Sequence, residues 1–196
     1  MKKMIATIFS DSIAAKQQFL ATSGEALERA TEEVVQTLQS GGKILLFGNG
    51  GSAADAQHIA AEFVNRYVRE RPPLPAIALT TDTSALTSIA NDYGVVDLFA
   101  KQVLALGKPG DIAIALSTSG NSPNVLRALD VCRDLGIRTV GLTGGSGGAM
   151  VGKVDHLLCV SATQNTPRIQ EVHILIGHTI CELVDFLLFE PTRNRE

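Results

Sequence analysis

Cysteine is scarce in this sequence of 196 residues, and its three cysteines lie far apart within apolar segments. Cys132, Cys159 and Cys181 form no CxxC pair, and an odd number of thiols provides no complete disulfide framework. We therefore expect buried packing thiols in a protein of a reducing compartment, in preference to metal ligands or nucleophiles.

Clusters of positive charge are also absent. The formal net charge is −3, and no run of lysine or arginine interrupts the sequence. Proteins that bind nucleic acid by electrostatic attraction normally show a basic face, so this balance argues against a nucleic-acid partner. Small soluble molecules remain possible substrates.

Long apolar segments are missing as well. The N-terminal stretch MKKMIATIFSDSIAAKQQF begins with a basic pair, but Asp11 and the polar residues after it interrupt the apolar core that a signal peptide needs. No segment approaches the ~20 consecutive apolar residues that span a bilayer. We expect a cytoplasmic protein with no membrane partner.

Hydrophobic residues make up 45% of the chain, which is enough for one domain with a substantial core over residues 1–196. Residues 1–40 contain no proline and repeat apolar positions at helical spacing, which predicts two N-terminal helices with a break near Gly24. An α/β core is expected over 41–192, with a frayed tail, PTRNRE, at the end. No internal linker or repeat divides the chain.

Short apolar runs alternate with helical patterns through the rest of the sequence. The runs are continuous, as expected for strands whose two faces are both covered, and the alternation predicts an α/β fold with a parallel sheet and right-handed crossovers. The expected strands are 43–48, 76–79, 111–117, 138–143 and 156–161, and the expected helices are 52–67, 83–91, 95–106, 122–135 and 167–189.

Two glycine-rich loops follow predicted strands, GNGGS (48–52) and STSGNS (117–122). In parallel sheets ligands bind beyond the carboxyl ends of the strands, and glycines, hydroxyls and helix N-termini together suit an anion. Alternatively, Ser52 and Ser122 are only helix N-caps. Two such loops in one sheet favour a ligand, whereas TGGSGG (143–148) is expected to be a flexible turn. Neither a GxGxxG nor a Walker lysine motif is present, so no nucleotide cofactor is expected.

His58 and Glu62 lie four residues apart, on one face of the helix that follows the first glycine loop. Such a pair is often an ordinary surface contact. Its position next to a candidate anion loop also suits an acid/base pair or two metal ligands.

The last predicted helix contains RIQEVHILIGH (168–178), in which His178 stands among apolar residues. A histidine in such surroundings is usually a core residue. Helical spacing leaves its partner open among Gln170, Glu171 and His173. Asn91 and Asp92, at the end of another helix, are explained equally well by turn chemistry and by ligand contacts.

Four stretches, GNGGSAADAQHIAAE, RPPLPAIALTTDTSALTSIANDYG, STSGNSPNV and RIQEVHILIGH, together resemble the sugar isomerase (SIS) domain family, and within it the sedoheptulose 7-phosphate isomerases. The resemblance covers nearly the whole chain. It implies a five-stranded parallel sheet between helices, a Rossmann-like three-layer sandwich. It also implies a homotetramer with sites at subunit interfaces, and conversion of sedoheptulose 7-phosphate into D-glycero-D-manno-heptose 7-phosphate for lipopolysaccharide heptose.

The resemblance also implies roles for individual residues. Glu62 matches the general base and His178 the general acid. Arg66 matches an arginine that reaches a neighbouring subunit's site. Phosphate binding falls to Ser117, Thr118, Ser119 and Ser122, and the other substrate contacts to Asn49, Gly50, Gly51, Ser52, Asn91, Asp92 and Gln170. The matching ligands for one zinc ion per site are His58, Glu62, Gln170 and His178.

A rival interpretation is a non-enzymatic relative that binds the bacterial replication initiator and shares the RPxLPAIALxTD and AND stretches. In that branch the positions of Glu62 and His178 are typically other residues, so their presence here favours the enzyme. An isomerase or sensor of another phosphosugar is a third interpretation, because phosphate loops do not encode chain length. His156 and His173 match no site position and are expected to be structural.

Overall fold

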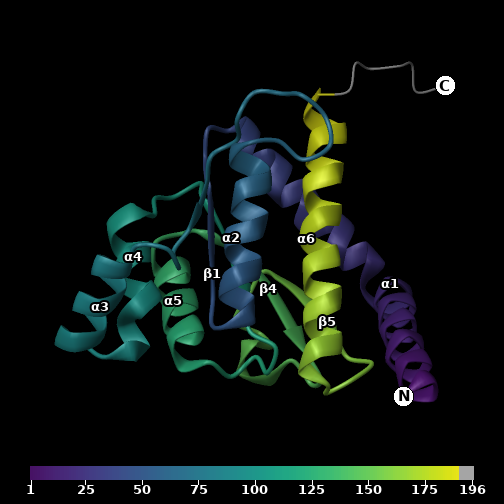
Figure 1. The fold of residues 1–196 in the computed structure, drawn as a ribbon. Coiled ribbons are helices and arrows are strands. Elements are labelled where there is room, and N and C mark those ends of the chain that lie inside the picture. The colour runs from purple at the N-terminus through teal and green to yellow at the C-terminus, as the bar shows by residue number, and fades with distance from the viewer. Residues whose placement is uncertain (190–196) are drawn as a thin grey trace.

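A five-stranded parallel sheet forms the centre of the computed structural model, which describes residues 1–189 (Figure 1). The strand order is β2-β1-β3-β4-β5, and all neighbouring strands are parallel. The bounds are β1 Ile44–Gly48, β2 Ala76–Ala78, β3 Ile112–Leu116, β4 Arg138–Gly144 and β5 His156–Val160. The predicted fold class is confirmed.

Helices cover both faces of this sheet. On one face lie α1 Lys2–Gln39, α2 Gly51–Val64 and α6 Thr166–Phe189; on the other lie α4 Leu98–Leu106 and α5 Pro123–Asp134, with α3 Thr83–Asp92 beside α4 and short 3₁₀ turns η1 Val95–Asp97 and η2 Gly148–Met150. Strand β1 shows why the apolar runs are continuous. Ile44 and Leu46 belong to the hydrophobic core between the sheet and α1, α2 and α6, which we call the first core. Leu45 and Phe47 belong to the second core, between the sheet and α4 and α5. Each face of the strand therefore buries its own side chains.

The expected break near Gly24 is wrong, because α1 is one helix of 38 residues. A glycine inside a helix costs only about 1 kcal/mol relative to alanine. The buried face continues on both sides of it, with Ala15 and Phe19 before and Leu27 and Ala30 after. Packing of this face against α6 and β5 holds the helix together across the glycine. The expected core boundary at 192 and the frayed tail lie outside the described residues.

Helix α6 bears on the expectation that no segment is apolar enough to span a bilayer. Among the described residues it is the one helix that is long and apolar enough to cross a membrane by length and composition. Core helices of soluble proteins pass the same test, and α6 contacts α1, α2 and β4. Its buried residues, including Ile176, Ile180 and Val184, belong to the first core.

Candidate active site

Helices α2 and α6 lie side by side, and two glycines let them approach closely (Figure 1). A Cβ added at Gly177 of α6 would lie 2.4 Å from Ile59 Cδ1 of α2. A Cβ added at Gly51, in the first turn of α2, would lie 2.4 Å from Nε2 of Gln170. A larger residue at Gly177 would press on Ile59, whereas one at Gly51 would displace the amide of Gln170.

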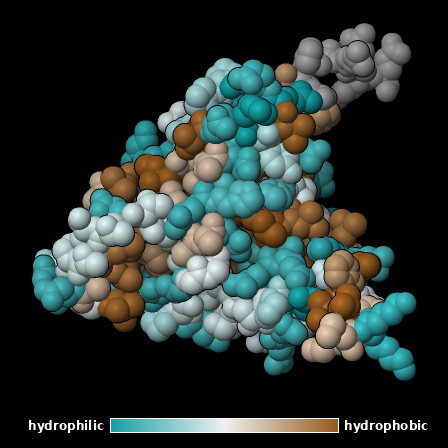
Figure 2. Space-filling view, viewed as in Figure 1, coloured by the Kyte–Doolittle hydropathy of each residue, from teal (hydrophilic) through white to brown (hydrophobic). Residues whose placement is uncertain are grey.

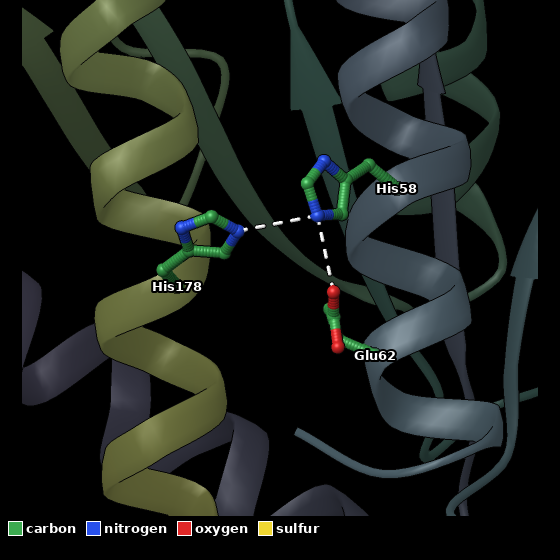
Figure 3. Close-up of side chains that lie close together, drawn as sticks. All are labelled: His58, Glu62 and His178. Atoms are coloured by element: carbon green, nitrogen blue, oxygen red, sulfur yellow. Dashed lines mark hydrogen bonds and ion pairs between the residues drawn. The ribbon is translucent and has the colours of Figure 1, made fainter. Parts of the chain in front are cut away.

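Three polar side chains meet between these helices (Figure 3). His58 Nε2 lies 3.0 Å from Glu62 Oε1 on the same helix and 3.3 Å from His178 Nε2 on α6. One ligand atom from each of the three residues lies within 4.8 Å of the others. The group is open to solvent, since the His58 side chain is 48% exposed and that of Glu62 is 24% exposed.

The donor set of this group fits a divalent metal ion. A single proton on His58 Nε2 cannot form good hydrogen bonds to both Glu62 and His178. A cation would accept an electron pair from all three groups at once. Imidazole nitrogens and a carboxylate are ligands of zinc, and three protein ligands with an open position are typical of catalytic zinc sites. The residues that could hold the ion are therefore His58, Glu62 and His178.

Gln170, the fourth residue matched to a zinc ligand, is placed differently. Its amide lies against Gly51, seven residues before His58 on α2, which is about 10 Å along the axis. Helical spacing alone left the partner of His178 open. The structure shows that this partner is His58, on the other helix, rather than Gln170, Glu171 or His173.

Two neighbours of the group were not singled out in the sequence. Burial raises the pKa of Asp55, and the charges of His58 and His178 act in the opposite direction. Its spacing of three residues from His58 on a helix was an available signal. The ring of Tyr67 lies 5.5 Å from that of His178, and burial raises the pKa of its hydroxyl. Tyr67 follows the end of α2, where periodicity gives no signal.

The loop 117–122 lies between β3 and α5, at the carboxyl edge of the sheet. Ser117 Oγ and Ser122 Oγ are hydrogen-bonded at 2.9 Å. Ser122 occupies the N-cap position of α5, but its side chain makes no capping bond; at α2 the N-cap is Gly50 rather than Ser52. Capping therefore does not account for these hydroxyls, and an anion remains the better explanation.

Residues 143–148, which the sequence predicted to be a flexible turn, comprise the end of β4, a turn and the start of η2, and they pack on the loop 117–122. Together with the loop 117–122 (the serine loop) and the start of α6, these residues line a cleft. The lining residues are Thr118, Ser119, Gly144, Gly145, Ser146, Gln164, Thr166 and Ile169. The backbones meet directly, because a Cβ at Gly120 would lie 1.9 Å from Gly147 O. Met150 N donates to Gly120 O at 3.1 Å, and Ala149 N donates to Asn121 Oδ1 at 2.9 Å. These contacts hold the glycine loop against the candidate phosphate loop.

The first glycine loop is joined to the first turn of α5 by a pair of side-chain amides. Asn49 Nδ2 donates to Asn124 Oδ1, and Asn124 Nδ2 donates to Asn49 Oδ1, each at 2.9 Å. Asn124 Oδ1 also accepts from Val125 N at 3.0 Å. Asn49 was identified from the sequence as a substrate contact, whereas Asn124, which orients the Asn49 side chain, was not.

Three of the expected substrate contacts, Asn91, Asp92 and Arg66, have exposed side chains that pair with near neighbours in the sequence. Asn91 and Asp92 are exposed at the end of α3 and hydrogen-bond to each other at 2.8 Å. Arg66 follows α2 and forms an exposed ion pair with Glu70 at 3.5 Å. Within residues 1–189, no side-chain hydrogen bond or ion pair joins these three to His58, Glu62 or His178.

The remaining histidines and the thiols have local structural roles. His173 is fully buried with its Nε2 3.0 Å from Thr143 O, and burial lowers its pKa to about 4. His156 lies 3.4 Å from Glu33. Cys132 and Cys181 are buried in the cores, as predicted for packing thiols, whereas Cys159 is half-buried. Burial raises the pKa of Cys132 and Cys181 to about 12.

These features define an α/β protein with a candidate divalent-metal group between two helices and glycine loops suited to a phosphorylated ligand. The SIS domain family matches residues 9–144, and the chain belongs to this family, in its phosphoheptose isomerase group. The phosphoheptose isomerase of Roseiflexus sp. (strain RS-1) is 57% identical over 179 residues, covering 91% of this chain and 90% of that protein.

Solved structures agree with this family assignment. The phosphoheptose isomerase of Neisseria gonorrhoeae superposes with a TM-score of 0.89 at 45% identity, covering 94% of this chain and 98% of that one. The enzyme of Francisella tularensis gives 0.90 at 42% identity, with 94% and 97% covered. The relatives named here are isomerases, so the replication-initiator-binding interpretation gains no support from them.

Proposed function

We propose that the protein is an aldose–ketose isomerase that converts sedoheptulose 7-phosphate into D-glycero-D-manno-heptose 7-phosphate, a precursor of lipopolysaccharide heptose. The relatives that share over half of its residues are phosphoheptose isomerases. The observation that carries the proposal is the meeting of Glu62 and His178, from distant parts of the chain, in one polar group. The reaction needs a base and an acid that face the same substrate.

The isomerisation moves one proton between adjacent carbons through an enediol. Glu62 takes the proton from C1 of the ketose and returns it to C2, while His178 transfers the hydroxyl proton between O1 and O2. Each general acid or base contributes about 10²–10⁴-fold. The loop 117–122 holds the phosphate, and this remote anchor supplies orientation. C1 is oxidised and C2 is reduced within the same molecule, so there is no net redox change and no nucleotide cofactor is needed.

The proposed zinc ligands are His58, Glu62 and His178, which lie together, with one ion per site. Gln170 is proposed as a fourth ligand from the family resemblance alone, because its amide lies against Gly51. When bound, zinc would polarise the oxygens of the sugar and stabilise developing negative charge. A carboxylate bound to a cation is less basic. The base role proposed for Glu62 would therefore be filled by its carboxylate when it does not hold an ion.

The proposed assembly is a homotetramer with sites at subunit interfaces. Its support is an apolar face on the N-terminal half of α1, where the exposed side chains include Met4, Ile5, Ile8, Phe9 and Ile13. Figure 2 shows hydrophobic atoms gathered at the lower right, over this part of α1. Exposed apolar patches of this kind mark interaction surfaces.

We also propose a cytoplasmic location, since the proposed substrate is a sugar phosphate and the thiols are free.

The isomerase assay is the decisive experiment. Purified wild type, Glu62→Gln and His178→Ala are incubated with sedoheptulose 7-phosphate, and the aldose is detected. Loss of turnover in both variants, with circular dichroism unchanged, supports the proposal. Glu32→Gln, which removes an exposed carboxylate on α1, is the control and should retain full activity. An inactive wild type that binds the replication initiator instead would reverse the proposal.

Sharing of sites between subunits has a separate test. Arg66→Ala is expected to lower activity without unfolding, because Arg66 is exposed beyond the end of α2. Mixed tetramers of Arg66→Ala and Glu62→Gln subunits should regain activity at the sites that receive both native residues. Failure of every mixture to complement would contradict the shared site.

A further inference from the structure

A buried arginine fastens the end of α2 to α6. The side chain of Arg71 is 1% exposed and that of Asp185, on α6, is 4% exposed. Arg71 Nε donates to Asp185 Oδ1 at 2.6 Å. The guanidinium also faces the last turn of α2, where Nη1 donates to Phe63 O and Nη2 donates to Glu62 O, both at 2.8 Å.

The carbonyls of Glu62 and Phe63 lie in the last turn of α2, where no backbone N–H of the same helix is available to donate to them. The last four carbonyls of a helix have no intrahelical partner, and α2 ends at Val64. A cation at this end is also favoured by the helix dipole. Leu74 N reinforces the contact by donating to Phe63 O at 3.0 Å. Arg71 therefore restrains the turn that carries the proposed base, Glu62.

Asp185 extends this restraint to the other side of the candidate active site. It follows His178 by seven residues, about two turns along the same rigid helix. The backbone of Glu62 is thus linked to the helix of His178 through one guanidinium and one carboxylate. We propose that Arg71 and Asp185 are positioning residues of the isomerase, which set where the Glu62 carboxylate stands relative to His58 and His178. This inference rests on the proposed function.

Stability alone is a weak explanation for this pair. The cost of removing two charges from water is comparable with their attraction, and hydrophobic replacements of buried pairs are often neutral or stabilising. Within residues 1–189, Asp185 Oδ2 has no hydrogen-bond partner, so the pair is not fully satisfied. Its geometry is specific: the planar fork of arginine reaches three backbone carbonyls, those of Glu62, Phe63 and Pro72, and a carboxylate in fixed directions, which lysine cannot do.

The test compares Arg71→Lys and Asp185→Asn with Asp111→Asn. Asp111 is the buried acid of another ion pair, with Lys43, at the opposite, amino edge of the sheet. For each protein the melting temperature, kcat and KM are measured, and zinc affinity is obtained by competition with a chromophoric chelator. Asp185→Asn retains the shape and an acceptor oxygen, so it remains informative if Arg71→Lys does not fold.

We expect kcat and zinc affinity of the two positioning variants to fall by about 10–100-fold, as found when groups that orient metal ligands are removed. KM should change little, because the phosphate is held elsewhere. Asp111→Asn should lose thermal stability while keeping kcat and zinc affinity. The positioning role is overturned if zinc affinity stays at the wild-type value and kcat falls no more than in Asp111→Asn. An inactive wild type would overturn the proposed function instead, and the zinc affinities would still decide the positioning role.

Discussion

Replacing Gly177 by alanine tests whether the spacing of α2 and α6 controls the candidate active site. Gly177 immediately precedes His178 on α6, and Ile59 immediately follows His58 on α2. The contact between Gly177 and Ile59 therefore sets the distance between the two helices right beside the histidines. No polar group is changed by the substitution.

The size of the effect follows from the contact distance. The new Cβ would lie 2.4 Å from Ile59 Cδ1, whereas ordinary contacts begin at 3.4 Å, so the Cβ and Ile59 Cδ1 must move apart by about 1 Å, and we expect α2 and α6 to take up part of this movement. A displacement of about 1 Å in catalytic geometry can cost about 10²-fold in rate. Overpacking should cost about 1–3 kcal/mol of stability, offset by about 1 kcal/mol of helix propensity. The variant should fold but turn over slowly.

The assay measures kcat with sedoheptulose 7-phosphate, zinc affinity and the free energy of unfolding. Gly24→Ala is the matched control, because the nearest atom to its new Cβ, Leu20 Cδ1, is 3.6 Å away. It should gain up to about 1 kcal/mol of stability with unchanged kcat. The double variant Gly177→Ala, Ile59→Ala removes the clashing atoms and should recover part of the lost zinc affinity.

A wild-type kcat and zinc affinity in a folded Gly177→Ala protein would refute this reasoning. It would mean that Ile59 or the surrounding core absorbs the added methyl group without moving the histidines. The proposed ligand geometry would then not depend on how closely the two helices pack.

Three further predictions concern the metal, the buried histidine and the thiols. Stripping divalent ions with a chelator should lower both activity and melting temperature, and added zinc should restore both. The loss of stability should reach about 2.7 kcal/mol if the ion was present at 100 times its Kd. If neither activity nor melting temperature changes, the metal has no role. Because burial lowers the pKa of His173 to about 4 from 6.5, its contribution to stability is full above pH 6.5 and declines as pH falls toward 4. Relative to His173→Gln, wild type should therefore lose about 2 kcal/mol between pH 7 and pH 5 in denaturant titrations, and parallel titrations would contradict this. Cys132 and Cys181, whose pKa values burial raises to about 12, should resist alkylation at pH 8 until the protein unfolds, and rapid labelling of the native protein seen by mass spectrometry would contradict their burial.

Much of the fold could be predicted from local patterns. Each strand lies within two residues of its apolar run, because a strand buried on both faces needs a continuous apolar stretch, as Ile44 to Phe47 show. At Gly24 the local cost of a glycine was weighed without the packing that continues on both sides. Two other helices also differ from prediction: the helix expected over 52–67 ends at Val64, and residues 95–97 of the helix expected over 95–106 form a 3₁₀ turn. The HxxxE pair was also visible in advance, since residues four apart share a face of any helix.

The amino-acid sequence by itself determined the alternating elements, the glycine loops at the strand ends and the pairing of His58 with Glu62, because each depends on spacing within one segment. Only the tertiary structure decided that His178 meets His58, that Gln170 lies against Gly51, that the loop 143–148 packs on the serine loop, and that Arg71 reaches the carbonyl of Glu62. Helices α2 and α6 are separated by about a hundred residues, and their distance and rotation follow from side chains that interlock only after folding, Gly177 against Ile59 above all. Helical periodicity gives the face on which a residue lies, but the residue opposite it depends on how two faces pack.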